Sequence, residues 1–250
     1  MQKGVKRGTK PLCPNSRHAH IDLAMTTTAH FSLNQVDQTC RKAAKGTGLP
    51  WGLADDIGKA VRWLVAFRLI DLATFAQYLQ SYSEASYFDV IPQDLSSPLR
   101  ARAGSLNPLM TGMALSDQLA ALVEGDVDAI HCSTIEHPIF VAGFLGQSAL
   151  TEDQTLSLSW AGVELIFYRE AIIVNGTKED LSRAMADQIV CKSCSPLSQQ
   201  PSPATQPVIG SVEVETTTWQ LLETLAHRTY VEATEQSRNA GAGAGLNDND

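Results

Sequence analysis

The sequence predicts a single α+β domain, because helical periodicity fills its N-terminal third, alternating strands its middle and one more helix the region near its C-terminus. The chain of 250 residues is long enough for one full hydrophobic core, and its 44% hydrophobic fraction is ordinary for a globular protein. The longest apolar run, 60–72, is interrupted by Arg62, Arg68 and Asp71. No segment is therefore predicted to span a bilayer.

The N-terminal third is predicted to form a helical hairpin. Ser32 and Gln35 have the spacing of a capping box and start a helical pattern. A second helix is expected after the Leu-Pro-Trp-Gly turn, with Asp55 and Asp56 in its first turn. A third amphipathic segment at 72–82 is expected to pack across the first two.

The segment 86–108 is predicted to be a long surface connection, because three prolines interrupt any periodicity there. A short helix at 116–124 and a strand at 127–132 are expected to follow it. The next helix is apolar, and Pro138 suits its first position.

The middle of the chain carries the clearest β-strand signal. Residues 155–160 alternate strictly between apolar and polar side chains, and an Ala-Gly turn leads into a second apolar run at 163–168. These two runs predict an antiparallel β-hairpin. Further short elements are expected at 171–174 (strand), 178–186 (helix) and 189–191 (strand).

The C-terminal third is predicted to contain a linker, a helix and a glycine-rich tail. Residues 193–207 are rich in Ser, Pro and Gln and indicate a flexible segment. The helix expected from 218 to 226 has its apolar side chains on one stripe. The tryptophans are interpreted as core or core-edge residues: Trp51, Trp63, Trp160 and Trp219.

The chain is acidic overall, but its N-terminal segment is basic. The formal net charge is −8, although five basic residues stand against one acid in the first 24 residues, so the rest is more acidic still. Such a body disfavours nucleic acid as a partner. We expect a disordered extension at 1–30, with Met25 as an alternative start, and a single domain at 31–250. The extension lacks an apolar signal region, which favours a cytoplasmic location.

Cysteines and histidines offer two candidate sites. The five cysteines are an odd number in a long chain, so reduced thiols are expected, and Cys191 and Cys194 form a lone C-x-x-C without a second pair to complete a metal site. No metal is predicted. His131 and His137 flank Glu136 near a strand-to-helix junction, where they suit either acid–base chemistry or a structural role.

The C-terminal run from Tyr230 is the most unusual segment. Alternating glycines allow close approach of a ligand to the backbone, and an arginine offers a planar fork for a carboxylate or phosphate. A frayed terminus is the alternative. The candidate ligand-binding residues are Tyr230, Glu235, Ser237, Arg238, Gly241, Gly243 and Gly245.

Two blocks carry a resemblance to a known family. The first is Gly-Leu-Pro-Trp-Gly-Leu-Ala at 48–54, and the second is Gly-Ala-Gly-Ala-Gly-Leu-Asn-Asp-Asn-Asp at 241–250. They resemble the hallmarks of a bacterial protein family of unknown function, with the likeness running over 32–250. The resemblance implies a bacterial origin, a one-piece domain and an ordered glycine-rich tail. It implies no activity or cofactor.

Two functions remain open from the sequence. The first is an enzyme or binding protein for a small anionic molecule held at the glycine-rich tail. The second is a non-catalytic accessory or regulatory subunit of a metabolic enzyme, with the N-terminal helical hairpin as its partner surface, because no complete catalytic set is visible. The cofactor is unknown. No membrane partner is expected, whereas a partner protein or a homo-oligomer fits the second function.

Overall fold

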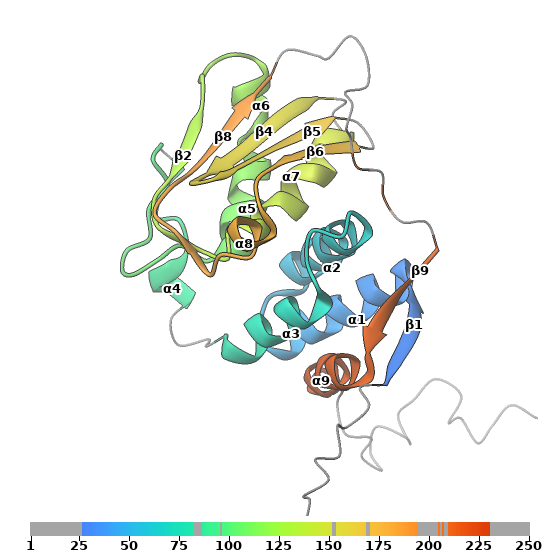
Figure 1. The fold of residues 1–250 in the computed structure, drawn as a ribbon. Helices are drawn as coiled ribbons and strands as arrows, with labels where there is room; N and C mark the ends of the chain where they lie inside the picture. The colour runs from blue at the N-terminus through green and yellow to red at the C-terminus, as the bar shows by residue number, and fades with distance from the viewer. Residues whose placement is uncertain are drawn as a thin grey trace, which may run out of the picture.

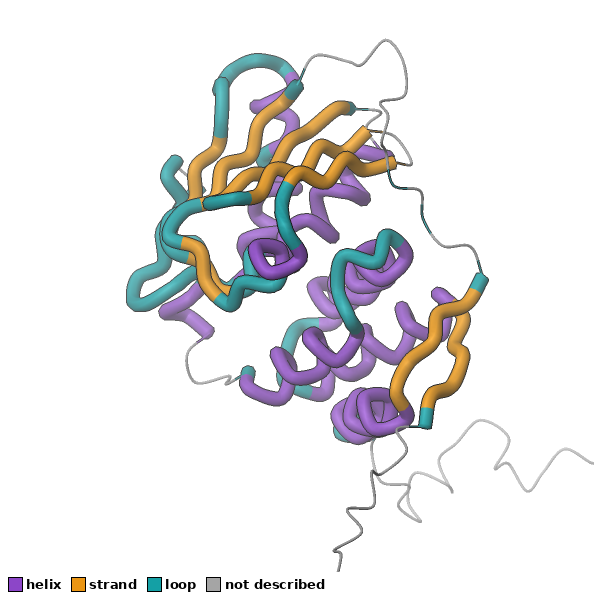
Figure 2. The backbone as a smooth tube through the Cα atoms, viewed as in Figure 1, coloured by secondary structure: helices purple, strands orange, loops and turns teal. Residues whose placement is uncertain are grey.

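The protein has an α+β fold made of a helical part and a sheet part (Figure 1). The computed structural model describes residues 27–82, 87–95, 97–151, 154–168, 171–194, 205, 207 and 210–230. Buried apolar side chains from both parts form one continuous hydrophobic core. The tube in Figure 2 shows helices from the two ends of the described chain together at one end of the molecule, and the main sheet with the remaining helices at the other.

The helical part joins the two ends of the described chain. The first helices are α1 (Leu33–Gly46), α2 (Trp51–Ala66) and α3 (Leu72–Ser81), and α9 (Thr216–His227) packs against α1 from the C-terminal side. Strand β1 (Thr28–Ser32) pairs antiparallel with β9 (Ser211–Glu215). Phe31 stacks on Trp219 with ring centroids 3.6 Å apart. The pairing of β1 with β9 ties the C-terminal helix to the N-terminal hairpin.

The start of α1 is stabilised by the capping box that the sequence predicts. The Ser32 hydroxyl accepts a hydrogen bond from the Gln35 amide at 3.2 Å, and the Gln35 side chain accepts one from the Ser32 amide at 2.8 Å. This arrangement satisfies amides that the first turn of a helix leaves unpaired. In the described part of the chain, strand β1 from Thr28 precedes the cap.

The prediction for α2 was wrong in its start. The helix begins at Trp51, so Asp55 and Asp56 lie beyond its first turn. Trp51 is 48% exposed at the start of the helix, contrary to the core or core-edge position expected for it, whereas Trp160 and Trp219 are buried.

The sheet part is built on five antiparallel strands in the order β2-β8-β4-β5-β6. The predicted hairpin is confirmed as β4 (Thr155–Trp160) and β5 (Val163–Tyr168), and β6 (Ala171–Asn175) extends it. On the other side of β4 lie β8 (Ile189–Ser193) and β2 (Ile130–Cys132). Helix α7 (Ile139–Thr151) packs against β4 and β5 and, on its other side, against α2.

Two expected helices differ from the structure. Helix α5 (Pro108–Asp117) begins well before residue 116, because Asn107 caps it by accepting hydrogen bonds from the Leu109 and Met110 amides; α6 (Leu119–Val123) follows. The helix expected at 178–186 ends early as α8 (Lys178–Leu181), and β7 (Met185–Ala186) then pairs with β3 (Ile135–Glu136). Within the described residues of the predicted connection at 86–108, the structure places the short helix α4 (Tyr87–Val90).

The two parts are held together where α7 crosses α2. A Cβ atom added at Gly143 would lie 2.6 Å from the Ala60 carbonyl oxygen, and one at Gly146 would lie 2.3 Å from the Trp63 ring. Only glycine permits such a close approach. The crossing therefore fixes the helical part against the sheet part and sets the shape of the cleft between them.

Candidate functional site

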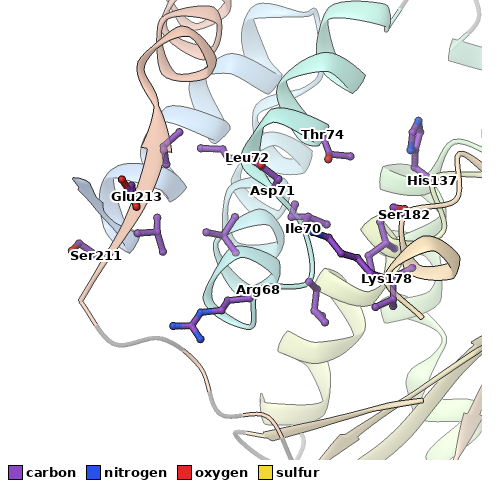
Figure 3. A pocket seen from close by; sticks show the side chains of 16 residues that line it. Arg68, Ile70, Asp71, Leu72, Thr74, His137, Lys178, Ser182, Ser211 and Glu213 are labelled. Atoms are coloured by element: carbon purple, nitrogen blue, oxygen red, sulfur yellow. The ribbon is translucent and has the colours of Figure 1, made fainter. Parts of the chain in front are cut away.

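A cleft of about 770 Å³ lies between the two parts. Its walls come from the turn between α2 and α3, the start of α7, helix α8 and strand β9 (Figure 3). Apolar side chains such as Leu69, Ile70 and Val212 alternate along these walls with the polar groups described below. We call this the interpart cleft.

Arg68 lines the interpart cleft in an unfavourable backbone conformation. It has φ of 56° and follows the last residue of α2, where its amide donates to the Val65 carbonyl at 3.1 Å. The Leu69 amide donates to the Leu64 carbonyl at 2.9 Å, which completes a Schellman helix end. Glycine is the usual residue at this position, because an L-residue in the left-handed region is strained.

His137 lines the same cleft and also has positive φ, of 36°. It directly precedes Pro138, a position where extended backbone is normal. Its amide donates to the Ala184 carbonyl at 2.9 Å, and its ring centroid lies 5.5 Å from that of Tyr78. Burial lowers the pKa of His137, against a smaller opposing effect of Glu136, so its imidazole is neutral at neutral pH.

These two residues are the non-glycine positions with φ above zero in the part of the chain that the structure describes, and both line one cleft. Strained backbone conformations of this kind cost of order 1–3 kcal/mol and cluster at functional sites. The coincidence of Arg68 and His137 therefore marks the interpart cleft as the candidate functional site.

The charged side chains of the cleft differ in how they are engaged. The Asp71 carboxylate caps α3 by accepting a hydrogen bond from the Ala73 amide at 3.0 Å, and the Glu213 carboxylate accepts one from the Thr28 hydroxyl. Within the described ranges, the side chains of Arg68 and Lys178 have neither a carboxylate partner nor a hydrogen bond. Figure 3 shows Lys178 extending from α8 toward the turn that holds Ile70 and Asp71.

Charged groups of both signs line the cleft, two cations and two carboxylates. The N-terminal ends of α3 and α7 both open onto it, at Leu72 and Ile139, and a helix N-terminus carries a partial positive charge. The first amides of both helices already have acceptors in the protein. Arg68 and Lys178, which have no partner among the described residues, are therefore the groups of the cleft that are available to an anion.

The residues predicted from the sequence lie elsewhere. Tyr230 follows α9 and is 59% exposed, with its ring 5.2 Å from that of His227 and 6.0 Å from the Lys42 Nζ. It does not line the interpart cleft. The remaining candidates lie outside the described residues: Glu235, Ser237, Arg238, Gly241, Gly243 and Gly245.

The fold places His131 and Cys191 on the neighbouring strands β2 and β8, whereas His137 lines the interpart cleft. Cys191 is buried in β8, where burial raises the pKa of its thiol to about 12, so the thiolate needed for redox or metal chemistry is disfavoured. His131 lies on β2 with its Nδ1 3.1 Å from the Gln188 Nε2. Among the described residues, no three His, Cys, Asp or Glu side chains are close enough to hold a metal ion.

The fold and the cleft define an α+β protein with a ligand-sized cavity between a helical part and a sheet part. Residues 31–106 match a protein family described as a protein of unknown function, DUF3726. The matched segment includes α1 to α4 and Arg68, whereas His137 and Lys178 lie beyond it. The chain matches no curated protein and no solved structure. None of the helices in the described ranges combines the length and apolar character needed to cross a membrane.

Proposed function

We propose that this protein binds a small anionic molecule in the interpart cleft. The observation that carries the proposal is Arg68, a cation without a partner among the described residues, at a helix-end position that glycine would occupy at lower cost. Folding stability alone does not explain an arginine there. A role for its side chain in binding does.

The size and lining of the cleft support a metabolite-sized ligand with an apolar body. Ligand pockets span about 300–1,000 Å³ and combine apolar walls with a few polar groups. Arg68 offers a planar fork and Lys178 a point charge, and both suit a carboxylate or phosphate. Leu69, Ile70 and Val212 supply apolar surface for the remainder of the molecule.

His137 extends the chemistry that the cleft can perform. Its neutral imidazole can accept a proton or a hydrogen bond from a ligand at neutral pH. Its backbone is held by the bond to Ala184 and its ring by Tyr78 and Phe140, so the ring is fixed in direction. A binding role is therefore compatible with acid–base catalysis on the bound molecule.

Thermal unfolding against a panel of small carboxylates, phosphates and nucleotides tests the proposal. A ligand at about 100 times its dissociation constant stabilises the native state by about 2.7 kcal/mol, or roughly 5–10 °C for a chain of this size. We expect Lys178→Ala to reduce this shift. Lys192→Ala, which removes an exposed lysine of β8 outside the cleft, is the matched control and should retain it. No shift with any compound, or equal shifts in both variants, would overturn the proposal.

The glycine-rich tail remains a separate prediction for the same ligand class. A chain shortened after Arg238 distinguishes the two locations. If shortening abolishes the shift while Lys178→Ala leaves it intact, the ligand binds at the tail and not in the interpart cleft. If Lys178→Ala abolishes the shift and shortening leaves it intact, the cleft is the site.

A further inference from the structure

A second surface combines exposed aromatic rings with cations, at the turn between α1 and α2. Trp51 is 48% exposed, and both the Arg41 guanidinium carbon and the Lys45 Nζ lie 5.8 Å from its ring centroid. Beside them, the Lys42 Nζ lies 6.0 Å from the ring of Tyr230, which is 59% exposed. We call these five residues the hairpin-end surface.

The cations alone have a structural explanation. Arg41, Lys42 and Lys45 lie in the last two turns of α1, where positive charge stabilises the negative end of the helix dipole. Arg41 also forms an ion pair with Asp55 at 3.1 Å. Lys42 and Lys45, however, have no carboxylate within ion-pair distance in the described part of the chain.

The aromatic residues need another explanation. Leu49 in the same turn is 1% exposed, so this turn is able to bury an apolar side chain, yet Trp51 projects outward. Tryptophan, tyrosine and arginine are the residues that most often dominate the binding energy of protein interfaces. A cation within about 6 Å of an aromatic ring centroid is attracted to the ring.

We propose that the hairpin-end surface docks an acidic segment of a partner polypeptide. Charge complementarity supports this occupant: Lys42 and Lys45 have no ion-pair partner among the described residues of a chain whose formal net charge is −8, so the described surface is a local positive region on an acidic molecule. Trp51 and Tyr230 provide the apolar anchors that such a segment needs. The same helical hairpin was expected from the sequence to present a partner surface.

A short acidic polypeptide fits this surface better than a nucleic acid. A nucleic acid strand places a phosphate on every nucleotide and would extend from the three cations over the acidic body. The Trp51 ring also already has Arg41 and Lys45 beside it, which leaves less of its face for base stacking. An acidic segment can confine its charge to the neighbourhood of the lysines.

The docking surface is independent of the interpart cleft. Trp51 is the first residue of α2, whereas Arg68 follows its end, and sixteen residues of helix separate the two by about 24 Å. The test for anion binding in the interpart cleft and the test for peptide binding at the hairpin-end surface can therefore give independent results.

Fluorescence anisotropy with a short labelled peptide of alternating Glu and Leu tests the proposal on the full chain. We expect the acidic peptide to bind, a Lys-Leu peptide of the same length not to bind, and affinity to fall as salt rises to about 0.15 M. Trp51→Ala should weaken binding about tenfold or more, because it removes the central aromatic anchor. Lys192→Ala should leave binding unchanged.

Charge reversal provides a second variant that is insensitive to any packing effect of Trp51→Ala. Lys45→Glu should abolish binding of the Glu-Leu peptide while the far-ultraviolet circular dichroism stays that of the parent. Absence of acidic-peptide binding, equal binding by Lys45→Glu, or preferential binding of an oligothymidylate of the same length would each overturn the proposal. The last result would assign the surface to single-stranded nucleic acid.

Discussion

Replacing Arg68 by glycine should stabilise the protein, in contrast to replacing it by alanine. Both changes remove the exposed guanidinium, so their difference reports the backbone alone. At φ of 56°, an L-residue costs about 1–2 kcal/mol relative to its preferred conformations. Glycine avoids this cost in the folded state. Its greater freedom in the unfolded chain, however, removes about 0.5–1 kcal/mol of the resulting gain in stability. We therefore expect Arg68→Gly to exceed Arg68→Ala in unfolding free energy by about 0.5–1 kcal/mol.

Urea unfolding followed by circular dichroism measures this difference directly. Both variants should lose the same part of any anion-induced stabilisation, because both lack the side chain that we place at the ligand. An Arg68→Ala variant as stable as Arg68→Gly would refute the reasoning. It would mean that the helix end carries no strain, and that the arginine needs no functional explanation.

Three further predictions concern packing, capping and pH. Gly143→Ala should destabilise the protein by about 1–3 kcal/mol, because its Cβ would lie 2.6 Å from the Ala60 carbonyl oxygen. Gly52→Ala, in open space within α2, should instead stabilise it. Changes of the same sign in the unfolding free energy of both variants, measured with urea, would contradict the packing argument. Ser32→Ala should cost about 1 kcal/mol by removing the capping box, and an unchanged urea midpoint would argue against it. Burial lowers the pKa of His137 in the folded state, so the unfolded chain binds the proton first as pH falls below about 6.5, and the free energy of unfolding should decrease there. His137→Asn should weaken this pH dependence. An unchanged slope of unfolding free energy against pH in the variant would count against the prediction.

Much of the fold could be predicted from local sequence patterns. The capping box at Ser32 and the alternation over 155–160 act over a few residues, and the structure confirms both. The β1–β9 pairing was not foreseen, because it joins Thr28 to Glu215 across most of the chain. Both strands alternate between polar and apolar side chains, but each is only five residues long and has no partner nearby in the sequence. The start of α5 was missed because Pro108 was treated as an interruption of periodicity, although Asn107 and Pro108 are typical of an N-cap and a first helical position.

The candidate site was much harder to predict than the fold. Arg68 and Lys178 belong to separate segments that only tertiary packing brings to one cleft. The conformation of Arg68 has no signal in the sequence, since a glycine would mark that helix end and an arginine does not. His137 was noticed, together with His131, for its place near a strand-to-helix junction, but its positive φ and its burial become visible only in the structure.

Two-dimensional ¹H–¹⁵N NMR spectra during titration with inorganic phosphate and with the small carboxylates of the panel test the central claim most directly. The account predicts that the perturbed amides belong to the walls of the interpart cleft, at 68–74, at 137 and 139, and at 178–182, and that Lys178→Ala suppresses these changes. Perturbations confined to other residues, or spectra unchanged by every anion, would contradict the claim that this cleft binds a small anionic molecule.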